Sequence, residues 1–383
     1  MHRCHRLPFA NERPSDLVQP VHTQKAHGCL NLLFQKLEHP NETRLAGCSE
    51  PPTLELADCH VETWVERFPI NGKFRISRAS KTEAEVVVCQ ITSGEFRGLG
   101  ECVPYSHYGE TVESVLEAIR ETAESLGDRI THDSLYEALS PGAARNALDC
   151  ALWDLRAKMT GRHAHLLACH QPPRPVETAF TISLDHPDAM ADAARAASRR
   201  PLLKIKLGGE HDISTMHAVA AAAPRSRIIA DANEGWTPER LPELMREAAR
   251  VHIAMIEQPL PAGQDEILAS MPHPVAICAD ESAHVASDLE KLGDRYDSIN
   301  IKLDKSGGLT EAIRMRDLAR GLGFGVMVGC MVGTSLAMAP AVLLAQDADY
   351  VDLDGPLLLA RDRSPGLDYA GSIVSPPRAD LWG

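Results

Sequence analysis

Charged residues stand at the ends of short apolar segments through the second half of the chain, and their types suggest chemistry. They are Lys204, Lys206, Asp231, Glu257, Asp280, Lys305, Asp352 and Asp354. Three of these carboxylates, on successive segments and with no Cys or His among them, form the oxygen-rich set that a hard cation prefers. We therefore expect Asp231, Glu257 and Asp280 to bind one Mg²⁺ per subunit. The alternative is that each acid caps a helix or pairs with a lysine.

The lysines suggest acid/base catalysis beside this metal. In an eight-stranded barrel the second and sixth strands face each other, so Lys206 and Lys305 would approach one bound molecule from two sides. Removing the α-proton of a metal-bound carboxylate yields an enediolate, whose charge the metal and an ammonium stabilise. One lysine would take the proton and the other return one to the opposite face, which inverts the α-carbon. The metal and Lys204, which shares a strand face with Lys206, would lower the pKa values of these lysines. The alternative is that the lysines only balance the acids.

The last charged pair suggests a substrate with a cationic group. Asp352 and Asp354 are two residues apart, so both can face the interior of a barrel. A free α-ammonium on the substrate is the expected partner. A structural arginine such as Arg361 is the alternative partner.

The segments that carry these residues predict a closed parallel barrel. Apolar, β-branched runs end in polar residues or glycine at nearly even intervals, and Ala- and Leu-rich stretches between them are long enough for one helix each. Eight strands and seven helices of this kind favour a (β/α) barrel over an open doubly wound sheet, since no Gly-x-Gly-x-x-Gly follows the first strand. The predicted strands are 179–184, 202–207, 227–232, 253–257, 275–280, 298–303, 324–328 and 350–353.

The residues before the barrel predict two further regions. Strand-like alternation around 61–67 and 85–92, followed by a helical pattern over 111–123, indicates a small α+β domain spanning 54–141. An Ala-rich helix over 143–159 then opens the barrel domain, 142–383. Residues 1–53 show little periodicity, and we expect them to be a poorly ordered extension.

Composition excludes several classes of protein. The 383 residues include 39 Lys and Arg against 53 Asp and Glu, a net charge of −14, which argues against nucleic-acid or anionic-membrane surfaces. Ten cysteines are spread singly and no secretory signal opens the chain, as expected of a reduced cytoplasmic protein. The uncharged stretch between Arg320 and Asp347 is interrupted by glycines and Pro340, so we expect a strand and a helix there rather than a membrane span.

Together these motifs resemble a known family. From about Leu54 to the C-terminus the chain is similar to the enolase superfamily, muconate-lactonising subgroup, and within it to the L-Ala-D/L-Glu dipeptide epimerases. The segments that carry the resemblance are Gly98-Leu-Gly-Glu101, Pro141-Gly-Ala-Ala-Arg-Asn-Ala-Leu-Asp149, Lys204-Ile-Lys206, Asp231-Ala-Asn233, Ile256-Glu257-Gln258-Pro259, Ala279-Asp280-Glu281-Ser282, Asn300-Ile-Lys302-Leu-Asp-Lys305-Ser-Gly-Gly308 and Asp352-Leu-Asp354-Gly-Pro356.

The resemblance implies a fold and a set of roles. It implies a modified (β/α)7β TIM-like barrel under an N-terminal α+β capping domain that part of the C-terminal segment joins. It also implies Mg²⁺ ligands at the three acids, catalysis by a lysine pair in a superfamily that combines a Lys or His base with Mg²⁺, and substrate binding at four residues. In order, these are Asp231, Glu257 and Asp280; Lys206 and Lys305; and Lys204, Asp352, Asp354 and Arg78.

The substrate-binding role of Arg78 is expected from its position in a capping-domain loop. The loop Ile76–Ser80, which carries Arg78, and the loop Tyr105–Tyr108 should close over the substrate. Arg78 is then a candidate for binding the distal carboxylate of a glutamate side chain.

The predicted function is therefore an isomerase that epimerises a dipeptide of the L-Ala-D/L-Glu type. Racemisation of an N-acyl amino acid, such as N-acetyl- or N-succinylglutamate, is the near alternative on the same scaffold. Two readings from other classes are a Schiff-base lyase using Lys206 or Lys305 and a non-enzymatic binding module. The expected partner is a small molecule, with no nucleic acid or membrane, and we also expect a homo-oligomer.

Overall fold

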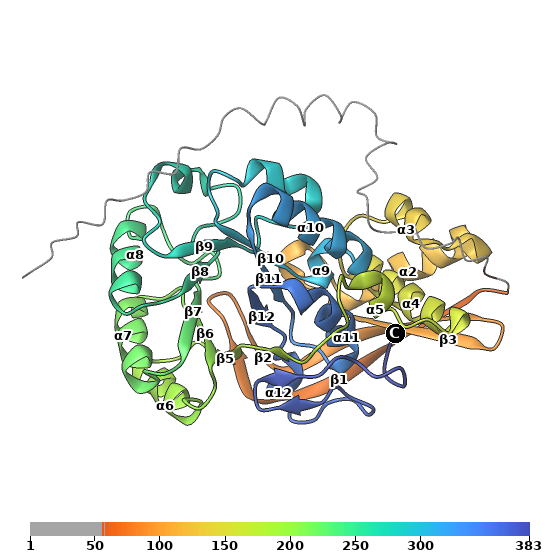
Figure 1. Cartoon of the computed structure of the whole chain (residues 1–383), viewed down its shortest axis with the longest axis horizontal. Helices are drawn as coiled ribbons and strands as arrows, with labels where there is room; N and C mark the ends of the chain where they lie inside the picture. Colours follow the sequence, from red (N-terminus) through yellow and green to blue (C-terminus); the bar gives the residue numbers. More distant parts are fainter. Residues whose placement is uncertain (1–55, 57) are drawn as a thin grey trace, which may run out of the picture. The chain divides into compact units, whose positions relative to one another are not determined.

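The computed structural model describes residue 56 and residues 58–383. The predicted extension, 1–53, therefore lies outside the described residues. The described chain contains an antiparallel sheet with helices, an eight-stranded parallel sheet with helices, and a small three-stranded sheet (Figure 1). These parts confirm a barrel with a separate N-terminal sheet and helix domain.

The N-terminal domain is an antiparallel sheet covered by helices. Its strands pair in the order β1-β2-β3, and a turn at Gly94 and Glu95 joins the last two strands. The strands are β1 (His60–Arg75), β2 (Ser80–Ser93) and β3 (Phe96–Cys102), and the helices that follow are α2 (Val112–Leu126) and α3 (His132–Ala138). Helix α4 (Ala143–Thr160), with which the predicted barrel domain opens, packs on β3, and α5 (His165–Ala168) follows it. Helix α2 begins at Thr111, whose side chain accepts a hydrogen bond from the Ser114 N–H.

Two glycines of β3 allow helix α4 to lie directly against the sheet. A Cβ built on Gly98 would stand 2.1 Å from the Ala151 carbonyl oxygen, and one on Gly100 would stand 2.1 Å from that of Ala147. Only glycine permits this approach of a helix backbone to a strand. The Gly98-Leu-Gly-Glu101 motif therefore positions β3, and with it Glu101, against the rest of the chain.

Replacing Gly100 with Ala should lower the free energy of unfolding by about 3 kcal/mol, because the helix has to move away from the strand. Thermal or denaturant unfolding measures this loss. Gly321→Ala is the matched control, since no heavy atom lies within 4 Å of its Cβ position and its backbone is helical. That control should unfold at or slightly above the wild-type midpoint, and equal effects at both glycines would contradict the packing account.

The eight parallel strands are the predicted ones. They pair in chain order from β5 to β12, and the barrel closes through hydrogen bonds next to the outermost strands, including the Ala179 N–H to the Val351 carbonyl at 2.8 Å. The strands are β5 (Phe180–Ile182), β6 (Leu202–Lys206), β7 (Arg227–Asp231), β8 (Met255–Glu257), β9 (Ala276–Ala279), β10 (Ser298–Ile301), β11 (Gly325–Gly329) and β12 (Tyr350–Asp352).

The connections differ from the prediction of seven helices. Longer α-helices follow five of the strands, but β8 and β9 are followed by 3-10 helices at Glu266–Ser270 and Ala286–Lys291. The prediction was wrong there because segment length alone does not distinguish a helix from a hydrogen-bonded loop. The α-helices are α6 (Pro187–Ala196), α7 (Asp212–Ala222), α8 (Leu241–Arg250), α9 (Leu303–Ser306), α10 (Leu309–Leu322), α11 (Ser335–Leu344) and α12 (Gly355–Leu358).

Alternation along each strand separates the core from the site. On β6, Leu203 and Ile205 pack outward among the residues of the large hydrophobic cluster, while Leu202 joins a smaller cluster inside the barrel with Ile229 and Met255. Residues that continue the inward set toward the carboxyl ends of the strands are charged or polar. The barrel thus has an apolar floor, and its polar layer lies at the carboxyl ends, where such barrels carry their active sites.

The C-terminal segment ties the two domains together. Leu359 forms a β-bridge with Ile70 of β1, and the buried Trp382 donates its indole N–H to the Cys150 carbonyl in α4 at 3.1 Å. A small antiparallel sheet pairs a segment just before β5 with two segments after β12. Its strands are β4 (Val176–Glu177), β13 (Tyr369–Ala370) and β14 (Ile373–Val374).

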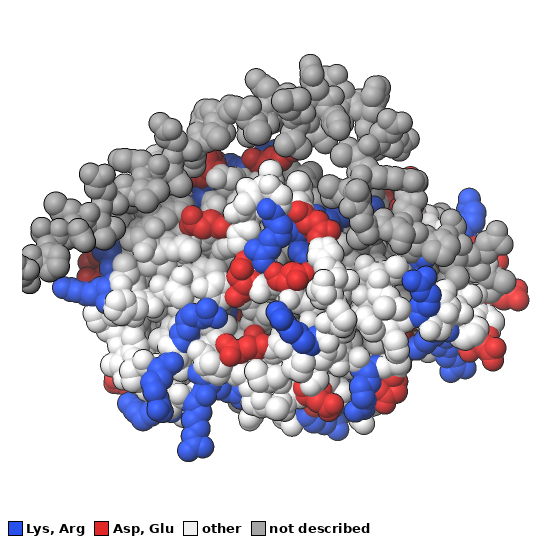
Figure 2. Space-filling model, in the orientation of Figure 1, with Lys and Arg blue, Asp and Glu red and all other residues white. Residues whose placement is uncertain are grey.

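The uncharged stretch before Asp347 forms β11 and α11, as predicted, and α11 is buried along its whole length. Among the described residues, no helix is long and apolar enough to cross a membrane. On the face shown in Figure 2, basic and acidic side chains are interspersed.

Candidate active site

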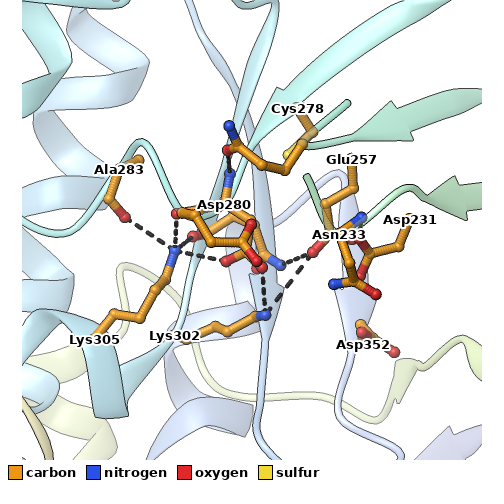
Figure 3. Close-up of polar contacts among 12 residues, drawn as sticks. Asp231, Asn233, Glu257, Cys278, Asp280, Ala283, Lys302, Lys305 and Asp352 are labelled. Atoms are coloured by element: carbon orange, nitrogen blue, oxygen red, sulfur yellow. Dashed lines mark hydrogen bonds and ion pairs between the residues drawn. The ribbon is translucent and has the colours of Figure 1, made fainter. Parts of the chain in front are cut away.

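Three carboxylates converge at the carboxyl ends of neighbouring strands. Asp231 and Glu257 end β7 and β8, Asp280 directly follows β9, and one ligand oxygen from each lies within 4.8 Å of the others. All three side chains are buried, and Figure 3 shows them near one another at the ends of their strands. A set of three carboxylate oxygens with no sulfur or imidazole matches the preference of Mg²⁺. The structure therefore brings together the predicted metal ligands, and their chemistry fits that ion.

Each carboxylate has a lysine ammonium against it. The Lys206 Nζ lies 2.6 Å from Asp231 Oδ2, and the Lys302 Nζ lies 2.6 Å from Asp280 Oδ2. Lys204 is 1% exposed, and its Nζ lies 2.6 Å from Glu257 Oε2. Burying three acids requires such compensation, since an unpaired buried charge is very costly.

These charges shift the pKa values of the acids in different directions. Burial acts to raise the pKa of Asp231, but the ammonium groups of Lys206 and Lys204 outweigh it and lower the pKa to about 2. Burial and the charge of Asp231 raise the pKa of Glu257 to about 7. Burial alone would lower the pKa of Lys302, yet the carboxylates of Asp280 and Glu257 raise it well above its usual value. The sequence predicts a lowered lysine pKa at this site, whereas the carboxylates around Lys302 raise its pKa.

One pocket between the barrel and the N-terminal domain exposes two lysines to a ligand. Lys206 ends β6 and Lys302 directly follows β10; both line the pocket, and these two strands are four apart in the eight-stranded order. Strands four apart face each other across such a barrel. Lys206 and Lys302 can thus approach a single ligand from two sides.

Lys305 does not occupy the predicted position. It lies on α9, is 1% exposed, and does not line this pocket. Its ammonium donates to the carbonyl oxygens of Ala283 at 2.9 Å, Asn300 at 3.0 Å and Asp280, and Asp280 Oδ1 lies 2.7 Å away (Figure 3). An ammonium has three hydrogens, so Lys305 has none left for a substrate. The structure therefore brings Lys302, and not Lys305, into the pocket with Lys206.

Strand periodicity could have identified Lys302. Ser298, Asn300 and Lys302 follow one another at the two-residue spacing that keeps side chains on one face of a strand. Asn300 points to the site, since its Nδ2 donates to Glu257 Oε1 at 2.8 Å. Lys305 is an odd number of residues from Asn300 and lies beyond the strand, so its face could not be inferred in the same way.

Asp352 and Asp354, the pair predicted to bind an ammonium group, both accept hydrogen bonds from other residues of the protein. Asp352 Oδ2 accepts a hydrogen bond from Lys204 at 2.8 Å, and Asp354 Oδ2 accepts the Thr181 N–H at 2.6 Å. Burial and the nearby charge of Asp352 raise the pKa of Asp354 to about 7. Neither aspartate lines the pocket shared by Lys206 and Lys302. The structure places the pair on the same barrel rim as the lysines without showing it open to a ligand.

Arg78 connects the N-terminal domain to the barrel. Its guanidinium donates to Glu281 Oε1 at 2.6 Å, to Glu234 Oε2 at 2.7 Å and to the Asn233 carbonyl at 2.9 Å. His107, from the second predicted loop, has its Nε2 3.0 Å from Glu234 Oε2. Both loops therefore lie over the barrel end, as expected. The sequence did not predict a role for Glu234 or Glu281, because Arg78, their partner, lies more than 150 residues away in the chain.

The structure is a capped parallel barrel that gathers three buried carboxylates and two facing lysines at the carboxyl ends of its strands. Comparison with known families agrees. Residues 59–167 match the mandelate racemase / muconate lactonizing enzyme N-terminal domain, and residues 188–358 match the enolase C-terminal domain-like model. The chain belongs to the mandelate racemase / muconate lactonizing enzyme group of the enolase superfamily.

Individual relatives cover most of the described chain. An N-acetyl-D-glutamate racemase from Pseudoalteromonas sp is 44% identical over 78% of this chain and 95% of its own length. The L-Ala-D/L-Glu epimerase of Escherichia coli K12 is 42% identical over 81% of this chain and 97% of its own. A crystal structure of an enolase family member from Agrobacterium tumefaciens with homology to dipeptide epimerases, with bound sodium and L-Ala-L-Glu, is 54% identical. It covers 85% of this chain and 100% of its own, with a TM-score of 0.84.

Proposed function

We propose that the protein is an isomerase that epimerises dipeptides of the L-Ala-D/L-Glu type by moving a proton between the two faces of the α-carbon. The observation that carries the proposal is the pair Lys206 and Lys302, which line one pocket beside three carboxylates. The substrate class is supported by the relatives, one an L-Ala-D/L-Glu epimerase and another crystallised with L-Ala-L-Glu.

Each residue has a role in this proposal. Asp231, Glu257 and Asp280 hold one Mg²⁺, which when bound supplies positive charge to the substrate carboxylate and acidifies the neighbouring α-proton. Lys206 and Lys302 are the acid/base catalysts, one removing a proton from one face and the other delivering one to the opposite face. Lys305 is a positioning residue, since its hydrogen bonds hold the Asp280 and Ala283 carbonyls against α9.

Deuterium exchange tests this function directly. The protein with Mg²⁺ in D₂O should introduce one deuterium at the α-carbon of the C-terminal residue of L-Ala-L-Glu and of L-Ala-D-Glu, and each should convert to the other. Mass spectrometry and chiral chromatography read the two events. Absence of exchange with every dipeptide in a library would overturn the proposal.

Racemisation of an N-acyl amino acid is the second candidate. It is favoured by the N-acetyl-D-glutamate racemase relative and by the engaged state of Asp352 and Asp354, which an uncharged acyl group would not need to displace. Three carboxylates, from Asp231, Glu257 and Asp352, already surround the ammonium of Lys204, so its role in holding the substrate carboxylate stays a prediction for either reaction.

An Asp354→Asn variant separates the two candidates. For a dipeptide enzyme, kcat/KM for L-Ala-L-Glu should fall about 10- to 100-fold, because a buried ammonium loses a charged partner. The amide still accepts the Thr181 N–H, so the barrel rim should keep its shape. An N-acyl racemase should retain its activity on N-acetylglutamate within about twofold. Steady-state assays on both substrates, with thermal unfolding as the control, distinguish the outcomes.

The remaining assignments are the location, the assembly and the domain boundaries. Cytoplasmic location is supported by the free thiols of the described cysteines, which form no disulfide in the described part of the chain. A homo-oligomer, and domain boundaries at 54–141 and 142–383, stay predictions. Size-exclusion chromatography with light scattering would test the assembly.

A further inference from the structure

The loop between β11 and α11, residues 330–333, forms one wall of the pocket that the two facing lysines share. We call it the β11 loop. The residues of this loop that line the pocket are Cys330, Met331 and Val332. Gly329, which ends β11, pairs in register with Asp352 of β12, so the loop begins beside the aspartates predicted to bind an ammonium group. Burial and the charges of Asp352 and Asp354 raise the pKa of the Cys330 thiol, which agrees with this placement.

Glu101 of the N-terminal domain holds the other end of the β11 loop. It lies on β3 and is 1% exposed. Its Oε1 accepts the Thr334 N–H at 2.8 Å, and its Oε2 accepts the Thr334 hydroxyl. Thr334 directly follows the loop, and it is the residue at which α11 begins. A carboxylate of one domain therefore fixes the backbone and the side chain of a residue next to a pocket wall of the other.

Arg363 compensates the buried charge of Glu101. Its Nη2 lies 3.0 Å from Glu101 Oε2, and its Nε donates to Thr334 Oγ1 at 3.1 Å. The same Nη2 lies 2.6 Å from Glu66 Oε2 on β1. Glu101, Thr334 and Arg363 thus bind one another in a closed set. A buried polar network in which each member has a partner favours a single arrangement of the segments that it joins.

The β11 loop is packed directly against the end of β3. A Cβ built on Gly333 would stand 3.1 Å from Glu101 Oε1 and 3.3 Å from Val103 Cγ2. Val103 itself lines the pocket. Because protein interiors are closely packed, a shift of the Glu101 carboxylate displaces the loop and is not absorbed by empty space.

We propose that Glu101 is a positioning residue that sets the place of the β11 loop through Thr334, and with it the width of the pocket beside the first residue of the dipeptide. This role rests on the proposed epimerase function. Glu101 does not line the pocket, so it acts on the substrate only through the loop. The N-terminal domain would then determine substrate preference from a buried contact, in addition to covering the barrel end.

Two dipeptides that differ only in the size of the first side chain test this role. We expect the wild type to prefer L-Ala-L-Glu to L-Leu-L-Glu, and kcat and KM are measured for both. With Glu101→Gln the ratio of the two kcat/KM values should fall about fivefold or more, because a displaced loop discriminates less by size. The change should appear mainly in KM, since the two lysines and the three carboxylates keep their places.

Variants of Thr334 show whether Glu101 acts through this residue. Thr334→Val removes the hydroxyl and should lower the ratio as Glu101→Gln does. Thr334→Ser keeps the hydroxyl and should preserve the ratio within about twofold. The double variant Glu101→Gln, Thr334→Val should be no worse than either single variant, because both changes break the same contact.

Asp362 provides the matched control for a purely structural effect. It accepts the Ser335 N–H at 3.0 Å at the same end of α11, one residue further from the β11 loop. Asp362→Asn should lower the midpoint of thermal unfolding and leave the ratio unchanged.

The proposed role is wrong if Thr334→Val leaves the ratio intact, a result that decides the matter even where Glu101→Gln does not fold. It is also wrong if the losses in the double variant add, or if Asp362→Asn shifts the ratio as far as Glu101→Gln does. A wild-type protein inactive on every dipeptide would instead refute the underlying function.

Discussion

The Lys302→Gln variant should lose epimerisation by about a thousandfold, a typical effect of removing a positioned acid or base. The reason is that no other described ammonium of β10 or α9 reaches the pocket, since Lys305 is held by carbonyl oxygens. Stopped assays of L-Ala-L-Glu conversion measure the loss. Gln keeps much of the side-chain length and can still donate a hydrogen bond to Asp280, so the fold should be retained.

Lys305 provides the comparison for this prediction. Lys305→Gln removes hydrogen bonds that connect α9 to the loop after β9, so we expect a lower unfolding midpoint and a partial loss of activity. Lys302→Gln should show the reverse pattern, with little change in the midpoint and a nearly complete loss of turnover. If Lys305→Gln were inactive but fully stable while Lys302→Gln turned over normally, the reassignment to Lys302 would be wrong.

The second large effect concerns the metal site. Glu257→Gln should abolish Mg²⁺-dependent activity by about a thousandfold or more, because a neutral amide binds a hard cation far more weakly than a carboxylate. Glu257 lies among Asp231, Asp280 and Lys204, so replacing its carboxylate with an amide removes one negative charge from the cation site. Isothermal titration with Mg²⁺, together with activity after chelation and re-addition of the metal, measures the effect.

An exposed carboxylate gives the control for the metal site. Glu243 lies on the outer part of α8 and is exposed, so Glu243→Gln should bind Mg²⁺ and turn over like the wild type. Wild-type activity that survives exhaustive chelation would contradict the metal-dependent account. Trapping of a substrate carbonyl on a lysine by borohydride, insensitive to chelator, would favour the Schiff-base lyase in its place.

Much of the site could be predicted because strands impose a two-residue period. Asp231, Glu257 and Asp280 each stand where an inward-facing apolar series ends, and parallel strands bring such ends to one rim. The barrel followed from the same regular spacing. The helices were predicted less accurately, since the segments after β8 and β9 fold as 3-10 helices and not as the expected α-helices.

What could not be predicted depends on contacts between distant segments. The state of Arg78 is set by Glu234 and Glu281, which approach from two barrel loops, and no local pattern marks them as its partners. The choice between Lys302 and Lys305 depended on where β10 ends, and strand ends are the least certain part of a sequence-based assignment. The pairing of Asp352 with Lys204 likewise joins β12 to β6 across the closing seam of the barrel.

The central claim is that Lys206 and Lys302 act on opposite faces of one α-carbon, and α-proton exchange in D₂O tests it most directly when both lysine variants meet both epimers. Lys206→Gln and Lys302→Gln should each lose interconversion of L-Ala-L-Glu and L-Ala-D-Glu. Each variant should still exchange the α-proton of one epimer, and the two variants should retain opposite epimers. Retention of the same epimer by both variants, or interconversion that survives in either, would contradict the two-lysine mechanism.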